Sequence, residues 1–254
     1  MRLSKRMHMV ADMVRPGNVL ADIGCDHGYL SVWLVREKTV GRAIAMDLRE
    51  GPLKKAQESI RFFHQTETIE TRLSDGMDAL HPGEADRIVI AGMGGILMKD
   101  ILKRGSDCVA KAGQLVLQPQ SDPELVRAEV FRQGFTITDE QACFEDGKWY
   151  VSISAEPGTE ETPYTDAELR LGRILPMRGD KVFRDYLTEE LGKAERMLEG
   201  LLNAETDNAK ERIPAIRQRV SELRDALAVA SDRQQKPAES GRQKELKSLK
   251  KGNE

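Results

Sequence analysis

Short apolar runs alternate with amphipathic stretches along the first 155 residues of this 254-residue chain. The amphipathic stretches repeat apolar side chains every three or four residues, which is the spacing of a helix with one buried face. Strands and helices in this order build a parallel sheet with helices on both faces. We therefore expect an α/β domain with a doubly wound sheet whose first five strands lie at 19–23, 42–47, 71–75, 87–92 and 114–119.

The alternation of strand and helix stops after Gly134. The next two strand-like segments, FTITDEQACF and KWYVSIS, are joined only by EDGK, so they should pair as an antiparallel hairpin. Dinucleotide-binding Rossmann domains normally close with another helical crossover, whereas class I methyltransferases insert the last strand of a hairpin into the sheet. The pattern therefore predicts a Rossmann-like, seven-stranded sheet of the class I methyltransferase type.

A different pattern begins after a linker rich in Pro, Gly, Thr and Glu, AEPGTEETPYTD. Apolar residues spaced by three or four residues run through 183–201 and 213–227, which is the spacing of coiled-coil seams. The segment NAETDNAKER, with Pro214 just beyond it, can reverse the chain between them. We expect a catalytic domain over 1–155, a linker and helical hairpin over 156–230, and a disordered tail over 231–254, which lacks an apolar face.

Charge and cysteine content narrow the functional classes. A net charge of −3 argues against nucleic-acid binding through overall basicity, so a polyanionic substrate would need a local basic patch. Three widely spaced cysteines favour neither a disulfide framework nor a zinc cluster, and we expect no metal. No apolar run is long enough to span a bilayer and the first residues lack a secretory signal, so we expect a cytoplasmic protein without a membrane partner.

The candidate ligand site lies after the strands, because open α/β sheets bind ligands at the carboxyl ends of their strands. After the first strand, DIGCDHG fits the pattern D-x-G-x-G-x-G with Asp26 in place of the middle glycine. S-adenosylmethionine carries an ammonium and a sulfonium, so carboxylates near this loop favour it. Acids after the second and third strands could accept hydrogen bonds from its ribose hydroxyls and adenine amine. The expected cofactor-binding residues are Asp22, Gly24, Asp26, Asp47, Leu48, Asp75, Gly76 and Gly92.

The segments DIGCDHGYLS, AMDLREGPLKKAQESI, IVIAGMGGILMKDIL, LVLQPQSDPELVR and GKWYVSIS resemble the bacterial tRNA (adenine(22)-N(1))-methyltransferase family. The resemblance spans nearly all of residues 1–229. Gly28 and Ser31 depart from it, because the family pattern D-H-A-Y-L-P has Ala and Pro there. The resemblance implies S-adenosylmethionine as cofactor, tRNA as partner and methyl transfer to N1 of adenine 22. The target position comes from the resemblance alone.

This chemistry places limits on the site. N1 of adenine has an in-plane lone pair, so positioning should supply most of the acceleration, and the base must be unpaired or flipped to expose it. Methylation creates a cation on the base, which a nearby carboxylate would stabilise. We therefore expect Asp26, His27 and Tyr29 to act in catalysis, the last two by orienting or stacking on the base. The expected substrate-binding residues are Met93, Gly94 and Gln118, with Arg2, Lys5 and Arg6 as a phosphate patch.

Alternatives remain open from the residues themselves. The glycine turn and each acid could be structural, and an acid after the second strand is shared with NAD sites. The chain could be a class I methyltransferase acting on another RNA or on a small molecule, or a catalytically silent protein that binds S-adenosylmethionine or RNA. The helical hairpin could pack only on itself, form a dimer or embrace tRNA. A monomer is favoured over an obligate oligomer.

Overall fold

The computed structural model describes residues 1–204 and 206–235. The chain divides into two compact units, Met1–Gly172 and Arg173–Glu254. Residues 156–172, which the sequence assigns to a linker and a helical domain, therefore belong with the first unit. Of the tail expected from residue 231, residues 231–235 lie in a helix and the remainder lies outside the described residues.

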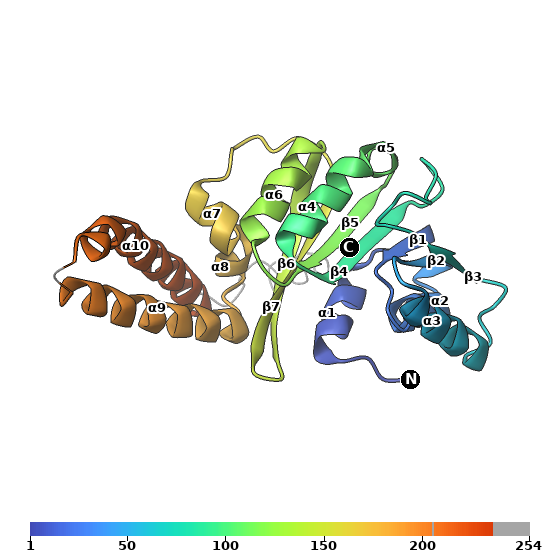
Figure 1. Ribbon diagram of the computed structural model, residues 1–254, viewed down its shortest axis with the longest axis horizontal. Helices are drawn as coiled ribbons and strands as arrows, with labels where there is room; N and C mark the ends of the chain where they lie inside the picture. Colours follow the sequence, from blue (N-terminus) through green and yellow to red (C-terminus); the bar gives the residue numbers. More distant parts are fainter. Residues whose placement is uncertain (205, 236–254) are drawn as a thin grey trace, which may run out of the picture. The chain divides into compact units, whose positions relative to one another are not determined.

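The first unit is built on one seven-stranded sheet of order β3-β2-β1-β4-β5-β7-β6, visible in Figure 1. β1 to β5 are parallel, and β7 lies antiparallel between β5 and β6. The predicted class I methyltransferase topology, with its last strand inserted by a hairpin, is confirmed. The strands are β1 (Gly17–Ile23), β2 (Val40–Asp47), β3 (Ile69–Leu73), β4 (Arg87–Met93), β5 (Gln114–Pro119), β6 (Phe135–Glu145) and β7 (Lys148–Pro157).

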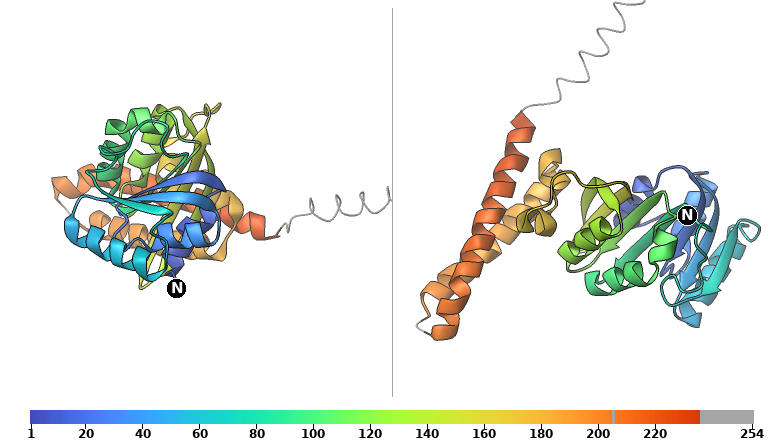
Figure 2. Two further views of the ribbon diagram at one scale, coloured as in Figure 1. Left: turned by 90° about the vertical axis from the view of Figure 1, so that its right-hand side faces the viewer. Right: turned by 90° about the horizontal axis from the view of Figure 1, so that it is seen from above.

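Helices cover both faces of this sheet. Figures 1 and 2 show α1 to α3 on one face and α4 to α6 on the other. Their bounds, with that of the last helix of this unit, are α1 (Lys5–Met13), α2 (Tyr29–Arg36), α3 (Glu50–Phe62), α4 (Gly95–Arg104), α5 (Ser106–Val109), α6 (Pro123–Arg132) and α7 (Asp166–Leu171). The core beneath α1 to α3 includes Val10, Leu20, Val32 and Leu34, each at most 1 % exposed.

The third strand begins two residues earlier than the sequence predicted. β3 pairs with β2 from Ile69, which is buried, and ends at Leu73. The expected final residues, 74 and 75, form a turn instead, because the Ser74 hydroxyl donates to the Gly76 carbonyl at 3.0 Å and accepts from the Ala79 amide at 3.0 Å. These local bonds compete with continuation of the strand.

The first helix is held by the hairpin that closes the sheet. Ser4 caps α1 by accepting a hydrogen bond from the Met7 amide. The Glu145 carboxylate at the end of β6 accepts from the amides of Lys5 at 2.5 Å and Arg6 at 3.3 Å. A carboxylate at a helix N-terminus binds amides that have no partner within the helix. The β6–β7 hairpin therefore fixes the start of α1.

The second unit contains α8 (Ile174–Arg178), α9 (Lys181–Leu202) and α10 (Asp207–Gln235). α9 and α10 run in opposite directions side by side, as the views in Figure 2 show. Ion pairs of Arg219 with Glu190 at 3.0 Å and Arg224 with Glu195 at 2.7 Å link them. The turn is shorter than predicted: α10 begins at Asp207 and contains Pro214. The buried seam residues are Phe183, Leu187, Ala194, Val220 and Leu223.

The part of the chain that the structure describes contains neither a membrane-spanning helix nor a cluster of metal ligands. Within 1–204 and 206–235, no helix has the length and apolar character needed to cross a bilayer. Over the same residues, no group of three or more His, Cys, Asp or Glu side chains is placed to hold a metal ion. The three cysteines carry free thiols, with Cys25 and Cys108 buried and Cys143 partly exposed.

A buried ion pair joins α6, β6 and α7. Arg127 and Glu140 are 1 % and 0 % exposed, and Nε and Nη2 of Arg127 both lie 2.7 Å from Glu140 Oε1. Arg127 Nη1 also donates to the Leu169 carbonyl at 2.7 Å, near the end of α7. Each charge here depends on its partner, since an isolated buried charge is strongly unfavourable.

We predict that Arg127→Met lowers the free energy of unfolding by about 3–5 kcal/mol, because it removes the buried Arg127 guanidinium from the Glu140 carboxylate. Adding Glu140→Leu to that variant should recover part of the loss, since both charges are then absent. Urea unfolding monitored by circular dichroism measures the free energy of unfolding of Arg127→Met, Glu140→Leu and the double variant. A double variant as unstable as the sum of the two single variants would show that the ion pair contributes no coupling.

Candidate active site

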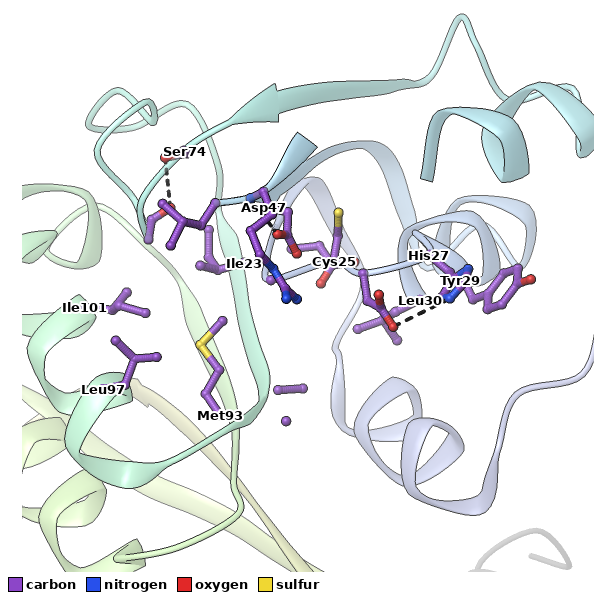
Figure 3. A pocket seen from close by; sticks show the side chains of 18 of the residues that line it. Ile23, Cys25, His27, Tyr29, Leu30, Asp47, Ser74, Met93, Leu97 and Ile101 are labelled. Atoms are coloured by element: carbon purple, nitrogen blue, oxygen red, sulfur yellow. Dashed lines mark hydrogen bonds and ion pairs between the residues drawn. The ribbon is translucent and has the colours of Figure 1, made fainter. Parts of the chain in front are cut away.

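A cavity of about 500 Å3 opens at the carboxyl ends of β1 to β4 (Figure 3). This is where the strand order reverses, because β1 lies between β2 and β4. The cavity is lined from β1 and its loop, from the turns after β2, β3 and β4, and from α1 and α4. Of the expected site residues, it brings together Arg6, Asp22, Gly24, Asp26, His27, Tyr29, Asp47, Leu48, Asp75, Gly76, Gly92 and Met93.

The loop after β1 contains three left-handed positions, each separated from the next by one residue. Gly24, Asp26 and Gly28 have φ angles of 77°, 48° and 68°. Asp26 therefore adopts the backbone conformation of the glycine that it replaces in the motif, and aspartate is among the few side chains that tolerate it. A side chain at Gly28 would meet Ala56 of α3 at 3.1 Å, so this glycine also permits close packing. The loop thus keeps the glycine-loop geometry while presenting a carboxylate.

Asp26 lies at the open side of this loop. Its side chain is 68 % exposed, and its carboxylate lies 3.9 Å from His27 Nε2. The His27 ring stacks on Tyr29, with centroids 5.5 Å apart and planes within 8°. The three residues expected to act in catalysis therefore form one contiguous group at the cavity mouth (Figure 3).

Asp22 lies at the floor of the cavity and is 4 % exposed. It accepts a hydrogen bond from the Ser31 hydroxyl at 2.7 Å. Burial and, to a smaller extent, the negative charge of Asp47 raise the pKa of Asp22, the hydrogen bonds from Ser31 lower it, and the net result is a pKa of about 6. The hydroxyl of Ser31 therefore stabilises the ionised form of Asp22.

Asp47 ends β2 beside this position and is 8 % exposed. One of its oxygens accepts from the Arg49 amide at 2.9 Å. Cys25 lies in the same lining, and burial together with the charges of Asp22 and Asp47 raises the pKa of its thiol. This part of the cavity therefore contains two buried acids and, in the loop after β1, a neutral thiol. Such a lining suits a cationic or hydroxyl-bearing ligand.

Asp75 has a partner that the sequence did not reveal. Arg104, near the end of α4, donates from Nη2 to Asp75 Oδ1 at 2.8 Å and lies 3.3 Å from Asp78. The hydrogen bond from Arg104 lowers the pKa of Asp75 below its usual range. Gly76 follows with a φ angle of 62°, and a side chain there would meet Ile101 at 3.0 Å. Arg104 thus keeps Asp75 ionised and limits its orientation.

The turn after β4 forms the opposite wall. The pairing of β4 with β5 shifts between Ala91 and Met93, at Gly92, whose φ angle is 78°. The Met93 side chain extends from this bulge into the cavity, and its terminal methyl lies over Gly24 (Figure 3). A side chain at Gly24 would collide with that methyl group. Gly24 and Met93 are therefore matched in size across the cavity.

Arg6 brings a cation to the rim of this wall. Its Nη1 donates to Gln118 Oε1 at 2.8 Å, and its guanidinium lies 5.4 Å from the Tyr150 ring centroid. Nη1 would also lie 3.1 Å from a side chain at Gly92. The absence of a side chain at Gly92 thus gives Arg6 access to the cavity.

Four expected substrate residues lie outside the cavity lining. Gln118 is 0 % exposed, and its Nε2 donates to the Pro119 carbonyl at 2.9 Å, so both ends of its amide are engaged. It positions Arg6, and the expected contact with substrate is replaced by this supporting one. Gly94 is the N-cap of α4, Lys5 is exposed at the start of α1, and Arg2 lines a neighbouring groove.

Sequence reasoning missed several side chains of the cavity. Leu97 and Ile101 line it from α4, four residues apart on one face of the helix, and that spacing after AGMGG was an available signal. Ser74, Arg49 and Gln120 also line it. These three follow strands two, three and five, but their residue types alone carry no specific chemistry.

Comparisons with known proteins agree with this geometry. Residues 3–153 match the family model described as Methyltransferase domain. The chain is 32 % identical to the tRNA (adenine(22)-N(1))-methyltransferase of Bacillus subtilis over 232 residues, which cover 89 % of this chain and 98 % of that protein.

Solved structures show the same similarity in three dimensions. The crystal structure of the B. subtilis m1A22 tRNA methyltransferase superposes with a TM-score of 0.81 at 31 % identity, covering 89 % of this chain and 99 % of the other. A candidate tRNA (m1A22) methyltransferase of Streptococcus pneumoniae, solved in complex with S-adenosyl-L-methionine, superposes with a TM-score of 0.80 at 30 % identity, covering 89 % and 100 %. The chain therefore belongs to the class I methyltransferases and, among them, to the tRNA (adenine(22)-N(1))-methyltransferase family.

Proposed function

We propose that this protein transfers the methyl group of S-adenosylmethionine to N1 of adenine 22 in tRNA. The observation that carries the proposal is the pair of buried carboxylates, Asp22 and Asp47, in a cavity of about 500 Å3 at the strand-order reversal. The choice of substrate follows from the similarity to the tRNA (adenine(22)-N(1))-methyltransferase of Bacillus subtilis. With tRNA as substrate the protein would work in the cytoplasm, and a monomer suffices because all the proposed site residues come from one chain.

The donor set of the cavity fits the cofactor. Asp22 is buried with a raised pKa, as expected of a carboxylate that has no cation within reach, and the cofactor's ammonium would supply one. Asp47 would accept from the ribose hydroxyls through the oxygen that Arg49 leaves open. Asp75 would accept from the adenine amine, and Leu97 with Ile101 would pack on the adenine ring. When bound, S-adenosylmethionine supplies an electrophilic methyl group next to a sulfonium.

The residues at the mouth would position and stabilise the acceptor. His27 and Tyr29 provide parallel ring faces against which a flipped adenine can stack. The Asp26 carboxylate adjoins them and would oppose the positive charge that develops on the methylated base. Arg6, held by Gln118 and Tyr150, would bind a phosphate oxygen of the incoming nucleotide. Since N1 needs no base to remove a proton, these positioning contacts carry the rate.

We predict that incubation with labelled S-adenosylmethionine and bacterial tRNA yields 1-methyladenosine on nucleoside analysis. A transcript with guanosine at position 22 is the matched control and should accept no label. Binding of S-adenosylmethionine without any transfer would instead identify a catalytically silent binding protein. Label on another base would keep the methyltransferase activity and remove the proposed target.

Cofactor affinity should depend on pH through Asp22. Because its pKa in the free protein is about 6, we expect affinity for S-adenosylmethionine to fall by up to about tenfold per pH unit below that value. Ser31→Ala removes the hydroxyl hydrogen bond that lowers this pKa and keeps the one from the backbone, so the decline should begin at a higher pH. Asp22→Asn should bind weakly without this pH dependence. Isothermal titration calorimetry between pH 5 and 9, about two units either side of neutrality, measures all three proteins.

The same shift affects stability in the opposite direction. Burial raises the pKa of Asp22 from its ordinary value of 3.8 to about 6, so the ionised group destabilises the free protein most fully above about pH 6. The penalty, about 3 kcal/mol, declines as the pH falls below about 6 and vanishes below about 3.8, where the carboxyl of the unfolded chain is protonated as well. Asp22→Asn should therefore raise the melting temperature at pH 8 while it weakens cofactor binding, and a variant that loses both would point to a structural role.

Asp26 should contribute chiefly to turnover. Asp26→Asn removes the charge but keeps a side chain that tolerates the left-handed backbone, so we expect kcat to fall at least tenfold at saturating cofactor and tRNA. Asp146→Asn is the matched control, because Asp146 is also left-handed, with a φ angle of 49°, but lies in the β6–β7 turn. Single-turnover kinetics would exclude the electrostatic role if the two variants behaved alike.

A further inference from the structure

A second, aromatic groove lies beside the active site. Phe62 at the end of α3 is 75 % exposed, the most exposed of the large hydrophobic side chains that the structure describes. It meets Phe63 edge to face, with centroids 4.9 Å apart and planes at 89°. Phe63 is supported from behind by the Arg36 guanidinium, 5.3 Å from its ring centroid. The groove measures about 480 Å3 and is lined by Met1, Arg2, Tyr29, Glu58, Ser59, Phe62 and Phe63.

The groove adjoins the active-site cavity. Tyr29 lines both, and it stacks on His27, which faces the cavity alone. A ligand in the groove would therefore be separated from one in the cavity by a single aromatic side chain. Two neighbouring nucleotides share one phosphate, so the base next to a flipped adenine must come to rest within this reach.

The charge around the groove suits a polyanion. Arg2 lines it and Arg36 lies behind it. Lys55 lies seven residues before Phe62 in α3, two helical turns away and therefore on the same face. Glu58 is the single acid in the lining that the structure describes. Arg2 and Glu58 balance each other within the lining, and Arg36 and Lys55 beside it add positive charge, which favours a nucleic acid over an acidic protein segment.

We propose that the aromatic shelf, defined as Tyr29, Phe62 and Phe63, binds the unstacked base of a nucleotide adjacent to the methylated adenine. The inference rests on the proposed function and deepens it. Extracting an adenine disrupts the stacking of its neighbours, and an exposed ring face offsets that loss for any base. The shelf would hold the RNA strand in the position that keeps the adenine in the cavity.

The test compares two substitutions at Phe62. Phe62→Leu keeps an apolar side chain but removes the ring face, and it should raise KM for tRNA about tenfold with kcat nearly unchanged. Phe62→Tyr keeps the ring and should retain the KM of the natural protein. Affinity for S-adenosylmethionine, measured by calorimetry, should be the same in all three proteins, which shows that the variants are folded.

Two results would overturn the inference. If the natural protein methylates tRNA and Phe62→Leu has the same KM, the shelf does not bind the substrate. If Phe62→Leu changes only the sedimentation of the protein, the groove is an interface between copies of the chain. A natural protein that transfers no methyl group would refute the proposed function itself, which this comparison distinguishes from failure of the shelf.

Discussion

Two carboxylates, Asp22 and Asp47, are buried at the ends of neighbouring parallel strands, and this arrangement constrains much of the first unit. Removing a charge from water is costly, and here the two charges raise each other's cost. The sheet register holds them in place, since Asp22 is paired with Ala45 and the residues that precede the two acids, Ala21 and Met46, are both 0 % exposed. A fold that accepts this penalty in its free state has a site prepared for positive charge. The hydroxyl of Ser31 offsets part of the penalty without neutralising it.

The loop after β1 shows how one residue in place of a glycine can preserve the backbone geometry and change the chemistry. The middle position of the motif requires a left-handed backbone, which Asp26 adopts with a φ angle of 48°. A glycine there would supply the same turn with no functional group. Aspartate costs some backbone strain and adds a charged acceptor at the mouth, next to His27 and Tyr29. The departure from the glycine pattern is thus the feature that separates this site from a general cofactor loop.

Local patterns predicted the elements, while contacts between distant residues lay beyond them. The range of β5 and the β6–β7 hairpin followed from apolar runs and turn residues, and the acids after β1 to β3 followed from their places in that order. The pairing of Asp75 with Arg104 joins residues 29 apart, and the bond of Arg6 to Gln118 joins residues 112 apart. No periodicity encodes such pairs, because they depend on how helices dock on the sheet. The turn before α10 was predicted to be too long, because Pro214 is tolerated inside a helix that packs along its partner.

The closing hairpin does more than complete the sheet. Glu145 at its tip binds the first amides of α1, and Tyr150 on its second strand contacts the guanidinium of Arg6. Gln118 of β5, which pairs with β7, binds the same guanidinium from the other side. Arg6 is thereby positioned by β5, β6 and β7, which form the opposite end of the strand order from β1 and β2, the strands that carry the acids. The cavity consequently has Arg6 fixed at the wall opposite the buried carboxylates Asp22 and Asp47, and this arrangement suits a site that must hold a cationic donor and an anionic RNA strand at the same time.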